Sequence, residues 1–184
     1  MKIVDKLIQL DLIEKKDADL YEYSSNILKD YIFFSVLILI INIFTKNLLS
    51  TIIFLFFFFN LRRFCGGIHF DNSKTCLVFS VVVIIILPLI SIKIQLSFFW
   101  VILMQLIFSF ILYFFPVVDS PNKFLDSKIK KIYMKYFRIN LLIYMLITLL
   151  TLYFNYDNLS KTILLVVIFT FFSNIFGWIK YKKS

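Results

Sequence analysis

The side chains that could do chemistry are concentrated in one short segment, residues 62–76, which reads RRFCGGIHFDNSKTC. A thiol near an imidazole is the pair with which cysteine enzymes form covalent acyl intermediates. The segment contains the single histidine of the 184-residue chain, both cysteines and two of the three glycines: His69, Cys65, Cys76, Gly66 and Gly67. We therefore take it as the candidate catalytic site.

The spacing of His69 and Cys76 constrains how they can meet. Seven residues apart on one continuous helix, they would be separated by about 10.5 Å along the axis, too far for a hydrogen bond. Asp71 and Asn72 favour turns and helix N-caps, so we expect a helix to begin at Ser73 with one of them as its cap. His69 then lies in a loop that folds back, and Cys76 lies in the first turn, where the helix dipole favours a thiolate.

The neighbouring residues have simpler interpretations. Gly66 and Gly67 permit a turn between loop and helix, which we favour over a second role as N–H donors to an oxyanion. Arg62 and Arg63 are expected to anchor the end of a membrane span, with recognition of a substrate carboxylate or carbonyl as the alternative. Cys65 has no predicted role.

A third catalytic residue is not identified by sequence. Asp71, Asn72 and Asn60 are the candidates, and a His–Cys dyad suffices in many thiol enzymes. A metal site is disfavoured because one histidine and two cysteines leave a fourth ligand to find, and their spacing matches no common zinc pattern. We expect neither a metal nor another cofactor.

The elements around this segment are apolar enough to lie in a membrane. The chain is 61% hydrophobic with 24 phenylalanines, and its mean hydropathy is +0.90. Long runs without charge predict an all-α integral membrane protein. Because the second run is short, four crossings plus a re-entrant pair compete with six crossings. The candidate spans are residues 31–45, 48–59, 75–92, 96–118, 139–154 and 162–178.

The rest of the chain fits one membrane domain over residues 1–184. Residues 1–26 are charged and amphipathic, so we expect a helix on the membrane surface, with an ordinary solvated helix as the alternative. They lack the apolar centre and the cleavage site of a signal peptide. Residues 60–76 form the candidate catalytic loop and helix start, and residues 119–138 form a basic loop. Pro88 is expected to kink the third span.

The distribution of basic residues predicts the orientation. With six crossings, 17 of the 20 Lys and Arg residues fall on the side of both termini and the catalytic loop, and the other three are Lys46, Lys93 and Lys161. The positive-inside rule then places both termini and residues 60–76 in the cytoplasm, where the cysteines stay reduced. A nucleic-acid partner is disfavoured because the basic residues flank spans, and an ion-coupled pump is disfavoured because the spans lack charges.

Arg62, Gly67, His69 and Cys76, in a loop between two spans of a small membrane protein, resemble the AgrB family of quorum-sensing peptide processors. The resemblance implies a cytoplasm-facing cysteine endopeptidase in a bacterial cell membrane. It further implies that His69 is the base and Cys76 the nucleophile, with Arg62 and Gly67 in supporting positions. A homodimer and an AgrD-like propeptide are the implied partners.

The chemistry implied by the resemblance is cleavage of the propeptide's C-terminal tail through a Cys76 thioester. A Cys or Ser upstream in the propeptide then closes a thiolactone or lactone ring, giving an autoinducing peptide. Lys128, Lys130 and Lys131 are expected to hold the acidic tail, although a purely topological role is also consistent with them. The alternative function is a non-enzymatic exporter or sensor scaffold, in which Cys76 would be no more reactive than Cys65.

Overall fold

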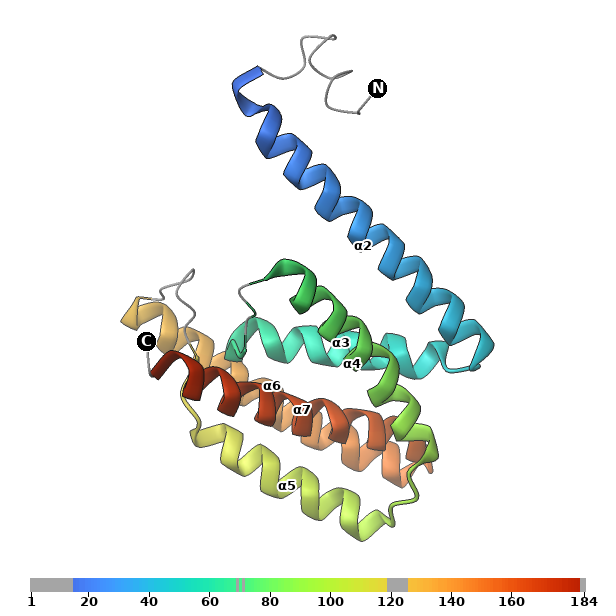
Figure 1. The fold of residues 1–184 in the computed structure, drawn as a ribbon. Helices are drawn as coiled ribbons and strands as arrows, with labels where there is room; N and C mark the ends of the chain where they lie inside the picture. The colour runs from blue at the N-terminus through green and yellow to red at the C-terminus, as the bar shows by residue number, and fades with distance from the viewer. Residues whose placement is uncertain (1–14, 69, 71, 119–125, 183–184) are drawn as a thin grey trace. The chain divides into compact units, whose positions relative to one another are not determined.

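The computed structural model describes residues 15–68, 70, 72–118 and 126–182. These residues form six α-helices and a 3-10 turn at Lys15–Asp17, without a β-strand (Figure 1). The predicted all-α fold is confirmed. The chain divides into two compact units, Met1–Ile41 and Asn42–Ser184.

The first unit consists of most of α2 (Ala18–Phe44). Its apolar part, Tyr21–Phe44, is long and apolar enough to cross a membrane. The predicted boundary between a surface helix ending at residue 26 and a span beginning at residue 31 is not seen, because no glycine or proline interrupts the run. Residues 1–14 of the predicted surface helix lie outside the described residues.

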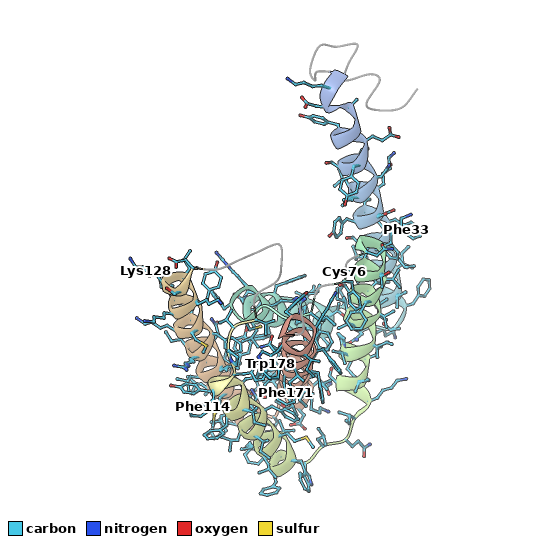
Figure 2. The ribbon with its side chains drawn as sticks, turned by 60° about the vertical axis from the view of Figure 1, so that its left-hand side comes forward. Phe33, Cys76, Phe114, Lys128, Phe171 and Trp178 are labelled. Atoms are coloured by element: carbon cyan, nitrogen blue, oxygen red, sulfur yellow. The ribbon has the colours of Figure 1, made fainter. Side chains whose placement is uncertain are left out.

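The second unit is a bundle of five helices: α3 (Leu48–Cys65), α4 (Ser73–Lys93), α5 (Phe98–Phe114), α6 (Ser127–Tyr153) and α7 (Asp157–Lys182). Helix α7 packs against the other four, and Figure 2 shows its ribbon, carrying Phe171 and Trp178, among them. Helices α3, α5 and α7 run in one direction and α4 and α6 in the other (Figure 1). We call the end where α3, α5 and α7 finish and α4 and α6 start the loop end.

The helix lengths revise the predicted spans. Helices α2, α3, α4, α6 and α7 are long and apolar enough to cross a membrane. Helix α3 continues to Cys65, which removes the reason for expecting a re-entrant pair at the second run. Helix α5 has 17 residues and is shorter than each of these five helices. It ends at Phe114, four residues before the predicted end, because Phe115 is extended ahead of Pro116.

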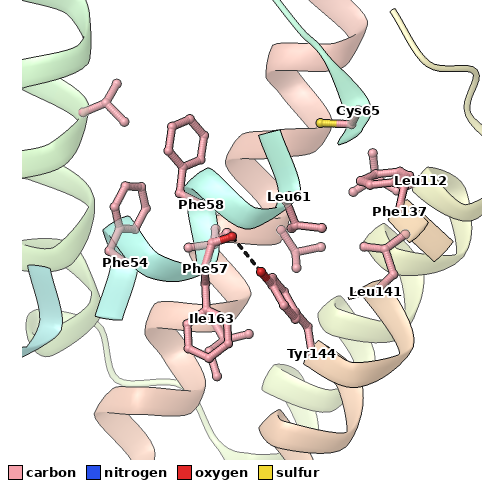
Figure 3. Packing of buried hydrophobic residues seen from close by; sticks show 13 residues of the cluster. Phe54, Phe57, Phe58, Leu61, Cys65, Leu112, Phe137, Leu141, Tyr144 and Ile163 are labelled. Carbon is pink, nitrogen blue, oxygen red and sulfur yellow. Dashed lines mark hydrogen bonds between the residues drawn. The ribbon is translucent and has the colours of Figure 1, made fainter. Parts of the chain in front are cut away.

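The core of the bundle is aromatic and holds α3 against α6 and α7. The Phe57 ring meets the Tyr144 ring edge-on at 4.8 Å, and the Tyr144 hydroxyl donates a 2.8 Å hydrogen bond to the Phe57 carbonyl (Figure 3). Phe58 packs against Phe169 of α7 with ring centroids 5.4 Å apart. These contacts fix the direction of α3, whose C-terminal end carries the candidate site.

Candidate active site

The candidate site begins where α3 ends at two glycines. The Gly66 N–H donates to the Arg62 carbonyl at 3.3 Å and so caps the helix. Gly66 and Gly67 have φ values of 75° and 128°, a region that favours glycine because it has no Cβ. The turn interpretation of the pair is therefore confirmed, and the Gly66 N–H is not free to serve an oxyanion.

Gly66 also lies against the segment that follows α5. The Val118 N–H donates to the Cys65 carbonyl at 3.0 Å. A Cβ built on Gly66 would lie 2.2 Å from the Val118 carbonyl oxygen, so only glycine fits here. This contact joins the end of α3 to the start of the predicted basic loop.

Gly67 lies against α7. A Cβ on Gly67 would come within 2.6 Å of the Ser173 hydroxyl oxygen. In turn, a Cβ on Gly177 would lie 2.7 Å from the Gly67 carbonyl carbon and 2.9 Å from the Ile68 nitrogen. All three glycines of the chain are thus used where the loop backbone meets α7 and the segment after α5.

The Arg62 side chain connects this loop to α7 through hydrogen bonds. Its Nη1 donates to the Ser173 hydroxyl at 2.7 Å, and its Nη2 donates to the Ile68 carbonyl. The guanidinium also lies 5.8 Å from the centre of the Phe58 ring. Two of its five N–H donors are therefore used within the protein, while its neighbour Arg63 is exposed.

His69 and Asp71 lie outside the described residues, but the residues flanking His69 are both described. The Ile68 N–H donates to the Ser173 carbonyl at 3.1 Å. The Phe70 ring packs on the Phe79 ring, 5.2 Å away, and Phe79 lies on α4. The chain is thus anchored to α7 just before His69 and to α4 just after it.

Helix α4 begins as predicted. It starts at Ser73, and the Asn72 side chain accepts a 2.9 Å hydrogen bond from the Lys74 N–H, so Asn72 is the N-cap. Cys76 lies in the first turn, where its own N–H donates to the Asn72 carbonyl at 3.1 Å. Its side chain is half-buried, and Phe79 follows it by three residues on the same face.

The two cysteines have different surroundings, and both are free thiols. Cys65 is 1% exposed and belongs to the aromatic core, with its thiol donating to the Gly66 carbonyl at 3.4 Å. The Asn174 amide of α7 lies close to this thiol. Cys76 is the accessible member of the pair.

An open, mostly apolar groove runs along one face of the first turns of α4, and Cys76 is not among its lining residues. Its volume is about 450 Å³. Lys74 supplies a cation at the end nearest the helix start. The lining residues are Lys74, Thr75, Val78, Phe79 and Val82.

The basic residues proposed to bind an acidic tail are on the first turns of α6. Figure 2 shows Lys128 at the start of that helix and Cys76 at the start of α4. Lys128 and Lys131 are exposed and share a face, whereas Lys130 is half-buried and lies on another side of the helix. The structure thus separates one of the three lysines from the other two.

The lysine-bearing turns of α6 are close to the candidate loop. The Phe64 ring at the end of α3 lies 5.9 Å from the Tyr133 ring and 5.7 Å from the Tyr136 ring of α6. Arg138 holds α6 to α5 through a 3.0 Å hydrogen bond to the Tyr113 carbonyl. The exposed lysines and the loop therefore belong to the same end of the bundle.

The candidates for a third catalytic residue are partly accounted for. Asn72 is engaged as the helix cap. The Asn60 amide donates at 2.8 Å to the Phe56 carbonyl of its own helix. Asp71 lies outside the described residues.

Sequence reasoning missed Ser173, Gly177 and Val118, all of which contact the loop. One signal was present, since small residues such as glycine in membrane helices let another backbone approach closely. Gly177 is such a glycine. Nothing in the sequence indicates that its neighbour is a loop more than one hundred residues earlier.

Comparison with protein-family models gives a match. The family model AgrB, described as Accessory gene regulator B, matches residues 1–174. Neither the comparison with curated proteins nor that with solved structures gives a match. The match covers nearly the whole chain, including the candidate loop and α3 to α6. With its several membrane-length apolar helices, this chain therefore belongs to the AgrB family of multi-pass membrane proteins, which act on AgrD-like propeptides in quorum sensing.

Proposed function

We propose that this chain is a membrane cysteine endopeptidase with Cys76 as nucleophile and His69 as base. The single observation that carries the proposal is the anchoring of the loop on both sides of His69. Ile68 is bound to α7, and Phe70 packs on Phe79, one turn beyond Cys76. This anchoring on both sides supports our proposal that the imidazole lies beside the turn that carries the thiol.

The environment of Cys76 supports its role as nucleophile. At the N-terminus of an apolar helix, the aligned peptide dipoles favour a negative charge. The capping bond of Asn72 keeps the first turn closed. The N–H groups of Ser73 and Thr75 precede the intrahelical hydrogen bonds, so we propose them as donors to a developing oxyanion. By contrast, Cys65 is enclosed by core side chains.

The reaction proceeds in two steps. His69 takes the proton of Cys76, and the thiolate attacks the carbonyl at the cleavage position. The peptide bond breaks, the tail leaves as an amine after accepting the proton from His69, and a thioester on Cys76 remains. A Cys thiol or Ser hydroxyl upstream in the propeptide then gives its proton to His69 and attacks the thioester. The ring closes, and Cys76 is released as a thiol.

The substrate has two regions to contact at the loop end. Lys128 and Lys131 form an exposed basic face for an acidic tail, and the Phe64 contacts keep α6 beside the loop. The groove along α4, which begins at Lys74 and Thr75, offers the propeptide an apolar surface near the start of that helix. Orientation with this end in the cytoplasm follows from the basic residues gathered there. We also propose that the chain forms a homodimer, on the basis of the family relationship alone.

The test is co-expression with the cognate propeptide and mass analysis of the product. Tail release is expected for wild type and Cys65→Ala but not for Cys76→Ala or His69→Ala. Cys65→Ala is the matched control because it removes the other thiol, and the amount of protein in the membrane is measured for each variant. Tail release by Cys76→Ala would contradict the peptidase and favour an exporter or a scaffold. A Cys76 no more readily alkylated than Cys65 would point the same way.

A further inference from the structure

We propose that α7 is the platform that positions the catalytic loop, with Ser173 and Gly177 as its positioning residues. The inference rests on the proposed function, because it assigns a role in bringing His69 to Cys76. Neither residue is placed in contact with substrate or with the reacting atoms. They act through the backbone of Gly67 and Ile68 and through Arg62.

Ser173 holds the loop in two ways. Its backbone carbonyl accepts the Ile68 N–H at 3.1 Å. Its hydroxyl accepts Arg62 Nη1 at 2.7 Å, and the same guanidinium donates to the Ile68 carbonyl. The N–H and the carbonyl of Ile68, the residue before His69, are therefore both held through Ser173, directly or by way of Arg62. Ser173 is itself buried.

Gly177 lets the loop approach α7 closely. It follows Ser173 by four residues, so the two lie on the same face of the helix, one turn apart. Any Cβ here would lie 2.7 Å from the Gly67 carbonyl carbon and 2.9 Å from the Ile68 nitrogen. These neighbours are backbone atoms and cannot rotate away. A methyl group at 177 must therefore displace the loop by several tenths of an ångström.

Such a displacement is expected to lower the rate of the catalytic step more than the affinity for the substrate. Misplacement of reacting groups by about 1 Å costs about 100-fold in rate. We expect Gly177→Ala to lower kcat for tail release at least tenfold, because the loop that carries the base moves. Ser173→Ala removes the hydroxyl but keeps the carbonyl that accepts the Ile68 N–H, so its expected loss is smaller, about fivefold, as for one typical hydrogen bond. KM is expected to stay within about twofold, since neither side chain contacts the substrate.

The experiment compares wild type, Gly177→Ala and Ser173→Ala in nanodiscs of bacterial lipid. It measures kcat and KM for tail release, together with hydrogen exchange of the peptide that contains residues 66–70. Ser160→Ala is the matched control. It removes a buried hydroxyl from the opposite end of α7, where that hydroxyl donates to the Asp157 carbonyl at 2.8 Å. Its kcat and its exchange at residues 66–70 should equal those of wild type.

The inference is supported if kcat falls in both variants at nearly constant KM and exchange of residues 66–70 rises. Because alanine is the better helix former, weakening of α7 itself cannot explain a loss in Gly177→Ala. If Gly177→Ala does not accumulate, Ser173→Ala decides, since it introduces no clash. A wild-type kcat or unchanged exchange in Ser173→Ala would overturn the platform while leaving the peptidase intact. Absence of tail release in wild type would instead overturn the proposed function.

Discussion

Replacing Asn72 tests whether this residue is a helix cap or a third catalytic residue. Its side chain accepts the Lys74 N–H at 2.9 Å and so closes the turn that carries Cys76. Loss of an N-cap side chain costs about 1 kcal/mol. That free energy corresponds to about a fivefold smaller equilibrium constant for closing the first turn. Asn72→Ala is therefore expected to lower kcat for tail release by up to about fivefold.

The conservative variant separates the two roles. Serine caps helices about as well as asparagine, so Asn72→Ser is expected to recover most of the lost rate. The same order, wild type followed by serine and then alanine, is expected for the rate of Cys76 alkylation, which needs no propeptide. Asn60→Ala serves as the control, because its amide donates to the Phe56 carbonyl within its own helix. It should stay within twofold of wild type.

One result would refute the capping argument. A loss of about 100-fold or more in both Asn72→Ala and Asn72→Ser, with Cys76 alkylation unchanged, is too large for a cap. It would mean that the Asn72 amide orients the imidazole, as the third member of a triad does.

Three further outcomes follow from the loop end. Phe79→Ala should lower kcat a few-fold, because an aromatic pair such as Phe70 and Phe79 contributes about 0.5–1.5 kcal/mol. Phe79→Leu should recover part of the lost rate. Equal rates for wild type and both variants would contradict the anchoring of the loop by Phe79. The double change Lys128→Gln and Lys131→Gln should raise KM at constant kcat and abolish the salt dependence of KM. Lys130→Gln should raise KM less. Equal increases in KM for the two variants would argue against a basic face shared by Lys128 and Lys131. Gly66→Ala should fail to accumulate or melt at a lower temperature in detergent, because its Cβ meets a backbone carbonyl 2.2 Å away; wild-type melting would show that this contact yields easily.

Local chemistry was predictable from the sequence. The start of α4 at Ser73 follows from the capping preference of Asn72 and the apolar run after it. The predicted end of the second span at residue 59 is too early, because the prediction treats Arg62 and Arg63 as lying beyond the helix, whereas α3 continues to Cys65. Arg63 remains helical while its side chain is exposed, and Arg62 remains helical because its guanidinium binds within the protein.

Contacts between distant segments were not predictable. The loop meets α7 because α3 and α7 run in the same direction side by side, a choice made by packing of the whole bundle. Arg62 was interpreted as an anchor or a substrate contact, but its guanidinium binds inside the loop. The different exposure of Lys130 was within reach of the sequence, since 100° per residue places it on another side of α6 from Lys128.

The contact between Arg62 and Ser173 also orders events during synthesis. The two residues are 111 positions apart. At about 5–20 residues per second, α7 leaves the ribosome about 5–20 s after the loop has been made. Until then Gly67 and Ile68 lack their contacts with Ser173 and Gly177 of α7. In the proposed mechanism, a newly inserted chain therefore carries its thiol and imidazole before it carries the helix that aligns them, and processing would wait until the bundle is complete.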